Sequence, residues 1–239
     1  MASDVVDLRD FYRSALGQVA RRMIRRAIQR VWPDLHGMRL LGIGYATPFL
    51  SALSGDTERT IAVMPATLGV LRWPPEGRSL VTLADEGELP FADYSIDRVV
   101  LVHAIETSDE VAAMLKEIWR VLAGGGRVLI VAPNRRGIWA RLDRTPFGSG
   151  RPYTMSQLSQ LLRDEQFTPI GSDTALFIPP ATSRVMLRSA AAWERIGKRW
   201  FPTFAGVLMV EATKQIYAKP VAARAPRRRL AYTPAPHGL

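Results

Sequence analysis

The 239-residue sequence contains no cysteine and only three histidines. Without cysteine there can be no disulfide framework, thiolate metal site, iron–sulfur cluster or cysteine nucleophile. The three histidines lie far apart in the sequence, so a metal site built from histidines is not expected. These absences predict a protein of the reducing cytoplasm that holds no metal ion.

Long hydrophobic runs are also missing. No stretch reaches the roughly 18 apolar residues that a membrane span needs, and the N-terminal MASDVVDLRDFY has acids where an export signal needs positive charge. We therefore expect neither a membrane span nor an export signal. Apolar residues make up 47% and charged residues 23% of the chain, which is typical of a globular protein with a sizeable core.

Acidic residues are absent from the C-terminal stretch. The chain has a formal net charge of +10, and five of these charges lie in the tail at Lys219, Arg224, Arg227, Arg228 and Arg229. A segment rich in alanine, proline and arginine cannot build a core, so residues 219–239 are predicted to be a disordered basic tail. The remaining net charge is weak evidence for nucleic-acid binding. An enzyme associated with nucleic acid is therefore only an additional, less favoured hypothesis.

Residues 1–37 are predicted to be an N-terminal amphipathic helical segment. Apolar pairs recur every four residues between positions 8 and 31, with arginines between them, and Trp32-Pro33 ends the pattern. Gly17 is the expected place for a bend. One interpretation is a basic helix on an anionic membrane or nucleic acid. The favoured one is a helix packed by its apolar face over a sheet edge or the mouth of an active site.

Residues 38–218 show short apolar runs that alternate with helical stretches. Buried strands are predicted at 39–44, 59–64, 79–84, 97–102, 126–132, 173–179 and 205–217. Helices are predicted at 48–53, 66–72, 109–122, 154–163 and 183–200, the fourth opened by a capping box of Thr154 and Gln157. This alternation predicts an α/β protein with a Rossmann-like, doubly wound, mostly parallel seven-strand sheet and helices on both faces.

Three stretches of the chain carry a more specific pattern. The first predicted strand runs into the glycine-containing turn of residues 41–50, LGIGYATPFL. Residues 85–97 read DEGELPFADYSID, and residues 117–126 read EIWRVLAGGG directly before the fifth strand. Over about residues 38–170 the chain resembles the class I S-adenosylmethionine-dependent methyltransferases, in their type 11-like branch.

This resemblance implies S-adenosylmethionine as the cofactor. It also implies methyl transfer to an unidentified acceptor, which is either a small molecule or a protein. An anionic acceptor is one alternative. The resemblance implies cofactor contacts after the first four strands, at Gly42, Gly44, Tyr45, Ala46, Met64, Asp85, Glu86 and His103. Asp85 matches the acid that faces the adenine, and its alternative role is that of an acid in a surface turn.

The sequence departs from the family pattern at two places. Only Gly44 retains a glycine of the family's loop, and Met64 stands where an acid takes the ribose hydroxyls. A thioether cannot supply the charge-assisted hydrogen bonds of a carboxylate, and each lost bond could cost about 1.5–3 kcal/mol. These departures favour the alternative hypothesis of a non-catalytic methyltransferase-like module that binds a partner.

His103 follows the fourth predicted strand and matches a histidine often found beside the cofactor in this family. It is a candidate general base or pocket wall, and Glu106 is its expected neighbour. A structural histidine held by hydrogen bonds is the alternative interpretation.

The loop after the fifth strand combines arginines with aromatic residues. It is predicted to bind the acceptor or a partner and to act as a lid, since arginine forks recognise carboxylate or phosphate. The candidate residues are Asn134, Arg135, Arg136, Trp139, Arg141, Arg144 and Tyr153. The alternative is a solvated loop with Trp139 and Phe147 tucked into the core.

Overall fold

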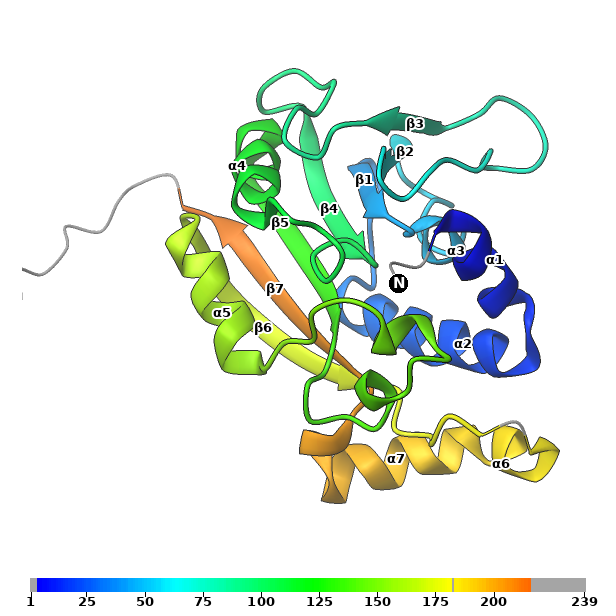
Figure 1. Cartoon of the computed structure of the whole chain (residues 1–239). Helices are drawn as coiled ribbons and strands as arrows, with labels where there is room; N and C mark the ends of the chain where they lie inside the picture. The colour runs from blue at the N-terminus through cyan, green and yellow to red at the C-terminus, as the bar shows by residue number, and fades with distance from the viewer. Residues whose placement is uncertain (1–3, 182, 216–239) are drawn as a thin grey trace, which may run out of the picture.

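Seven strands form one sheet in the order β3-β2-β1-β4-β5-β7-β6 (Figure 1). The computed structural model describes residues 4–181 and 183–215. Strand β7 is antiparallel to both of its neighbours, and the other strands run parallel. The strands are β1 (Arg39–Gly44), β2 (Arg59–Pro65), β3 (Val81–Ala84), β4 (Ile96–Val102), β5 (Leu122–Pro133), β6 (Phe167–Ala175) and β7 (Val207–Lys214). The predicted doubly wound α/β fold is confirmed.

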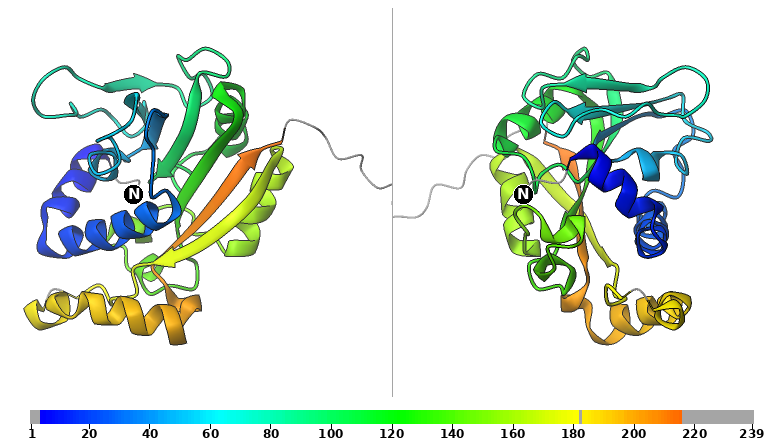
Figure 2. Two further views of the ribbon diagram at one scale, coloured as in Figure 1. Left: turned by 180° about the vertical axis from the view of Figure 1, so that it is seen from behind. Right: turned by 45° about the vertical axis from the view of Figure 1, so that its right-hand side comes forward.

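Helices cover both faces of the sheet (Figure 2). One face carries α2 (Ala15–Val31) and α3 (Thr47–Leu50), and the other carries α4 (Val111–Val121) and α5 (Met155–Asp164). The remaining helices are α1 (Val5–Arg13), α6 (Arg184–Arg188), α7 (Ala190–Trp200) and the 3₁₀ turns η1 (Trp139–Arg141), η2 (Pro146–Gly148) and η3 (Pro202–Phe204). Each face has its own hydrophobic core, as expected for a sheet buried on both sides.

The expected single helix over residues 8–31 is two helices, α1 and α2. The break lies at Ser14, whose Oγ accepts a hydrogen bond of 3.0 Å from the backbone N–H of Gly17 and so caps α2. A Cβ at Gly17 would lie 1.9 Å from the carbonyl oxygen of Phe11. Gly17 is therefore needed for the bend because the two helices approach closely there, although the chain turns three residues earlier.

Two other elements differ from their predictions. No helix forms over residues 66–72, where Gly69 adopts a φ of +87° that no right-handed helix contains. The sixth strand spans Phe167–Ala175 and not residues 173–179, because β6 is an edge strand with an exposed middle and does not show a continuous apolar run. The helix predicted over residues 183–200 is divided into α6 and α7 at Ser189.

The remaining elements lie within a few residues of their expected places, and the capping box of Thr154 and Gln157 is present. Residues 216–217 of the expected last strand, and the expected disordered tail, lie outside the described residues. Within the described part of the chain, no helix combines the length and the apolar character required to cross a bilayer.

Candidate active site

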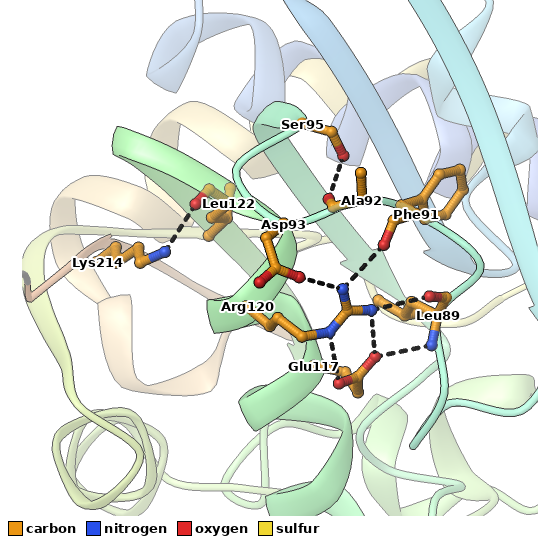
Figure 3. A network of polar contacts seen from close by, with 9 residues as sticks. All are labelled: Leu89, Phe91, Ala92, Asp93, Ser95, Glu117, Arg120, Leu122 and Lys214. Carbon is orange, nitrogen blue, oxygen red and sulfur yellow. Dashed lines mark hydrogen bonds and ion pairs between the residues drawn. The ribbon is translucent and has the colours of Figure 1, made fainter.

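The residues that carry the resemblance most clearly form a structural clamp (Figure 3). Arg120 of α4 contacts Glu117 at 2.8 Å and Asp93 at 2.6 Å, and it donates to the carbonyl oxygens of Leu89 and Phe91 at 2.9 Å each. Glu117 also accepts the backbone N–H of Leu89 at 2.9 Å. The guanidinium of Arg120 holds the pKa of Glu117 below its usual value. The clamp therefore fixes the segment between β3 and β4.

We expect Arg120→Ala to lower the free energy of unfolding by about 2–3 kcal/mol, since it removes several charge-assisted hydrogen bonds on a partly exposed group. Urea denaturation measures the loss. Lys116→Ala is the matched control, because Lys116 is exposed on the same helix and its loss should cost no more than about 0.5 kcal/mol. Equal effects of the two substitutions would show that the clamp contributes nothing.

The carboxyl ends of β1 and β4 approach each other very closely. Gly44 ends β1 with a φ of +80°, and a Cβ there would lie 2.4 Å from the carbonyl oxygen of Val102. The next residue, Tyr45, donates its backbone N–H to that same oxygen at 2.8 Å. The turn after β1 thus crosses the end of β4 and brings Tyr45 close to His103, at the edge where open α/β sheets bind ligands.

A buried hydrogen-bonded chain lies at this edge. The Tyr12 hydroxyl of α1 is 2.7 Å from His103 Nε2, and His103 Nδ1 is 3.1 Å from Glu106 Oε1. All three side chains are at most 4% exposed. The expectation that Glu106 neighbours His103 is confirmed. The second carboxylate oxygen of Glu106 has no hydrogen-bond partner among the described residues.

The direction of these hydrogen bonds follows from the protonation of Tyr12. Burial raises the pKa of Tyr12 well above its usual value, so its hydroxyl keeps a proton to donate to His103 Nε2. Because Nε2 accepts this bond, a neutral imidazole carries its proton on Nδ1, which donates to Glu106 Oε1. His103 itself has a φ of +50°, in the left-handed region where a non-glycine residue is strained. The arrangement orients Nε2 as a proton acceptor.

Aromatic rings cover His103. The ring of Tyr12 stacks on Tyr45 at 5.8 Å and meets Phe49 edge to face at 5.6 Å. From the loop after β5, Phe147 lies 5.1 Å from the His103 ring. Helix α1 and this loop together close the edge of the sheet above His103, which confirms that the N-terminal helical segment packs by its apolar face.

A small acidic cavity of about 220 Å³ lies at the same edge of the sheet. Its walls are Pro65 at the end of β2, residues 66–67 after it, Asp85 and Glu86 after β3, and residues 107–110 after β4. Burial raises the pKa of Glu86, and the Ser108 hydroxyl donates to its carboxylate. Asp85 is exposed and accepts the backbone N–H of Gly87 at 2.8 Å. The cavity therefore presents carboxylate oxygens to a ligand with hydroxyl or amino groups.

Three of the predicted cofactor contacts are enclosed by protein. A Cβ at Gly42 would lie 2.7 Å from the Leu50 side chain, so this position packs beneath α3. Ala46 is fully buried where α3 begins. Met64 is also fully buried, and its sulfur accepts the backbone N–H of Leu71 at 3.4 Å. The structure thus brings Asp85 together with Glu86, and Tyr45 close to His103, but leaves these three positions facing the core.

The predicted substrate-loop residues do not gather in one place. Asn134 is buried and donates to the carbonyl oxygens of Thr203 and Ala205 at 2.8 Å each, while Arg136 lines a cavity of about 570 Å³ there. Arg144 lines a separate cavity of about 800 Å³ next to α1.

The other four residues of that loop have different surroundings. Arg135 donates to the carbonyl oxygen of Pro152 at 3.2 and 3.1 Å, and Arg141 is exposed. Trp139 is buried and donates to the Ile178 carbonyl at 2.8 Å. The Tyr153 hydroxyl donates to the carbonyl of Ile105 at 3.3 Å. Trp139 and Phe147 thus lie in the core, as the alternative interpretation of this loop expected.

Sequence reasoning missed Tyr12 as a member of the site. The apolar pair Phe11 and Tyr12 was visible in the amphipathic pattern, and only the polar hydroxyl of Tyr12 distinguished it from an ordinary core position. Because Tyr12 is 91 residues from His103 in the chain, no local sequence pattern predicted their contact.

Comparison with known proteins agrees with this architecture. Residues 41–130 match the family model of a methyltransferase domain. An uncharacterized protein of Mycobacterium tuberculosis, Rv2003c, is 30% identical over 118 residues, which are 46% of this chain and 41% of that protein. The chain therefore spans less than half the length of this relative.

Two solved structures share the fold. A SAM-dependent methyltransferase of Thermotoga maritima, described as a possible histamine N-methyltransferase, has 18% identity and a TM-score of 0.60 over 84% of this chain and 91% of that one. The 1,6-didemethyltoxoflavin-N1-methyltransferase of Burkholderia thailandensis, solved with S-adenosylhomocysteine, has 17% identity and a TM-score of 0.53 over 84% and 78%. Residues 41–130 thus carry the match to a methyltransferase domain, and the strand order and the solved structures show that the chain has the fold of S-adenosylmethionine-dependent methyltransferases.

Proposed function

We propose that this protein transfers a methyl group from S-adenosylmethionine to an anionic acceptor. The observation that carries the proposal is the acidic cavity at the carboxyl ends of β2, β3 and β4, whose wall includes residues 107–110, directly after Glu106 in the chain. Carboxylate oxygens at Asp85 and Glu86 match the hydroxyl and amino donors of an adenosine group. The residues present therefore have the hydrogen-bonding groups that the adenosine half of this cofactor needs.

Each residue of the site has a separate task in this proposal. Asp85 and Glu86 hold the hydroxyl-bearing half of the cofactor, which when bound supplies an electrophilic methyl group. His103 Nε2 accepts the proton that the acceptor loses, with Glu106 keeping Nδ1 protonated and the ring oriented. Phe147 excludes water from the histidine, and Tyr12 covers it until the ligand binds.

Binding requires helix α1 to move. The acidic cavity holds about 220 Å³, below the roughly 300–1,000 Å³ typical of small-molecule sites, and Tyr12 fills the space next to His103. Displacing Tyr12 would free Nε2 and open the space that Tyr12 occupies beside it. We therefore propose that α1 acts as a lid, a task that the sequence had suggested for the loop after β5.

Calorimetry with S-adenosylmethionine and S-adenosylhomocysteine tests this function. We expect micromolar binding, and we expect Asp85→Ala and Glu86→Gln each to weaken it by about 1–3 kcal/mol, or roughly 5- to 150-fold, through lost hydrogen bonds. Glu88→Ala is the matched control because Glu88 is an exposed acid in the same segment, and it should leave the affinity unchanged.

Stability measurements provide a second readout for Glu86. Because burial raises its pKa, the folded state disfavours the charged carboxylate, and Glu86→Gln should not lower the free energy of unfolding at neutral pH. Lost cofactor binding in a variant of unchanged stability assigns Glu86 to the site. No heat from either cofactor at millimolar concentration would favour the alternative of a non-catalytic module, which Met64 and the covering Tyr12 also support.

A further inference from the structure

Another cavity, of about 730 Å³, has Tyr12 in its wall. It lies between α1, α2, the start of α3 and the segment 71–75. The space exists because α3 has only four residues and because the chain between β2 and β3 forms no helix, so both crossovers cover little of the sheet. Its volume is within the range of small-molecule sites.

Arginines dominate the walls of this cavity. They are Arg9 and Arg13 of α1, Arg21 and Arg25 of α2, and Arg72 after β2. The two helical pairs are each spaced i, i+4, which places the side chains of a pair on one face of their helix. The bend at Ser14 turns these two faces toward the same cavity, where no acidic side chain is part of the wall.

Most of these cations lack a partner. Arg9 pairs with Asp10 at 2.9 Å, and Arg72 donates to the carbonyl oxygen of Gly77. Within residues 4–181 and 183–215, the guanidinium groups of Arg13, Arg21 and Arg25 make no hydrogen bond or ion pair. The Nε of Arg25 is buried and unsatisfied. Like charges at i, i+4 destabilise a helix, and a buried unpaired donor does so too, so this arrangement is unfavourable until an anion binds.

Aromatic rings complete the cavity. Tyr45 and Trp73 line it together with Tyr12, whose hydroxyl reaches His103. Guanidinium groups form paired hydrogen bonds with phosphate and carboxylate oxygens, and the aromatic faces can stack on a planar group. Tyr12 is therefore the partition between a cationic cavity and the proposed proton acceptor.

We propose that this cavity binds a small organic oxyanion, a phosphate or polycarboxylate compound with at least two negative charges, through Arg13, Arg21 and Arg25. Its role as the methyl acceptor's site rests on the proposed function, whereas its binding of the anion does not. Because Arg9 and Arg13 lie on α1 together with Tyr12, an anion bound there would contact the helix that must move to free His103.

Titration of the full chain with inorganic pyrophosphate and, separately, with citrate tests the cavity and distinguishes the two oxyanion chemistries. We expect at least one of them to bind with heat and to raise the melting temperature. The triple substitution Arg13→Gln, Arg21→Gln, Arg25→Gln should weaken that binding more than tenfold without lowering the melting temperature of the free protein, because it removes repulsion.

The double substitution Arg22→Gln, Arg26→Gln is the matched control. Both residues are exposed on α2 but outside the cavity, so losing them reduces the net charge while changing the affinity less than twofold. Equal loss of affinity in the two variants would mean that only general charge attracts the anion, and the proposal would be wrong. Absence of pyrophosphate and citrate binding in the unsubstituted chain would also refute it.

Two further titrations separate the remaining outcomes. If single-stranded RNA or vesicles of anionic lipid bind through Arg13, Arg21 and Arg25 and the small anions do not, the face serves a polymer or membrane and the small-molecule proposal is overturned. Calorimetry with S-adenosylmethionine tests the proposed methyltransferase function independently of the anion titrations. Oxyanion binding without cofactor binding would support the proposed anion site and contradict the proposed methyltransferase function. Cofactor binding without oxyanion binding would support the methyltransferase function and contradict the anion site.

Discussion

Replacing Gly44 by alanine is expected to lower the free energy of unfolding by about 3–5 kcal/mol, a large part of the roughly 5–15 kcal/mol that stabilises a domain. Two costs combine at this position. The φ of +80° is unfavourable for any residue with a side chain, and the new Cβ would lie 2.4 Å from the Val102 oxygen and 2.8 Å from that of His103. Both neighbours are backbone atoms, so β1 and β4 would have to separate.

Gly125→Ala separates these two costs. Gly125 has a nearly identical φ of +77°, but a Cβ there would meet no atom within 4 Å. Gly125→Ala should therefore lower the free energy of unfolding by only about 1 kcal/mol, which is the cost of the positive φ alone. Chemical denaturation of both variants gives the comparison. Similar losses for the two glycines would mean that the ends of β1 and β4 yield easily, and the rigid placement of His103 would be incorrect.

Tyr12→Phe is expected to lower the free energy of unfolding by about 1–3 kcal/mol at pH 7, because the buried Nε2 of His103 loses its 2.7 Å partner. The ring contacts with Tyr45 and Phe49 remain in this variant. Tyr94→Phe is the control: Tyr94 is 57% exposed, and its hydroxyl has no hydrogen-bond partner in the described chain, so its removal should be neutral.

The effect of Tyr12→Phe should shrink at high pH. The pKa of Tyr12 is higher in the folded state than its usual value of 10.0, so its contribution to stability is complete below pH 10 and is lost as the pH rises through the folded pKa. The phenylalanine variant has no such group to lose. Urea midpoints measured between pH 7 and pH 11 should therefore converge above pH 10, and a constant difference would contradict the buried, protonated phenol.

Local pattern was enough to predict most of the sheet. Strands β1, β4 and β5 are buried on both faces, so they read as continuous apolar runs whatever packs against them. The edge strand β6 is half exposed and has no such run, so its position depended on pairing with β7, which follows about thirty residues later. Pairing of that kind leaves no local trace in the sequence.

Proximity in the chain also decided which parts of the site were predictable. His103 and Glu106 are three residues apart at the end of one strand, and their contact followed from the sequence. The motif over residues 117–126 that contains Arg120 was likewise visible, and so was the resemblance over about residues 38–170, which agrees with the match over residues 41–130, whereas the contacts of the clamp were not predicted. Short spacing fixes the relative placement of such residues once the local element forms.

The tertiary structure alone decided what covers the site. Tyr12 reaches His103 from 91 residues away, and the arginines of α1 and α2 share one cavity only because the chain bends at Ser14 and the crossovers beside it are short. The sequence determined that these helices were amphipathic and basic, since periodicity records which face is buried. It could not determine which end of the sheet that face would cover, because this depends on packing among elements that are distant in the chain.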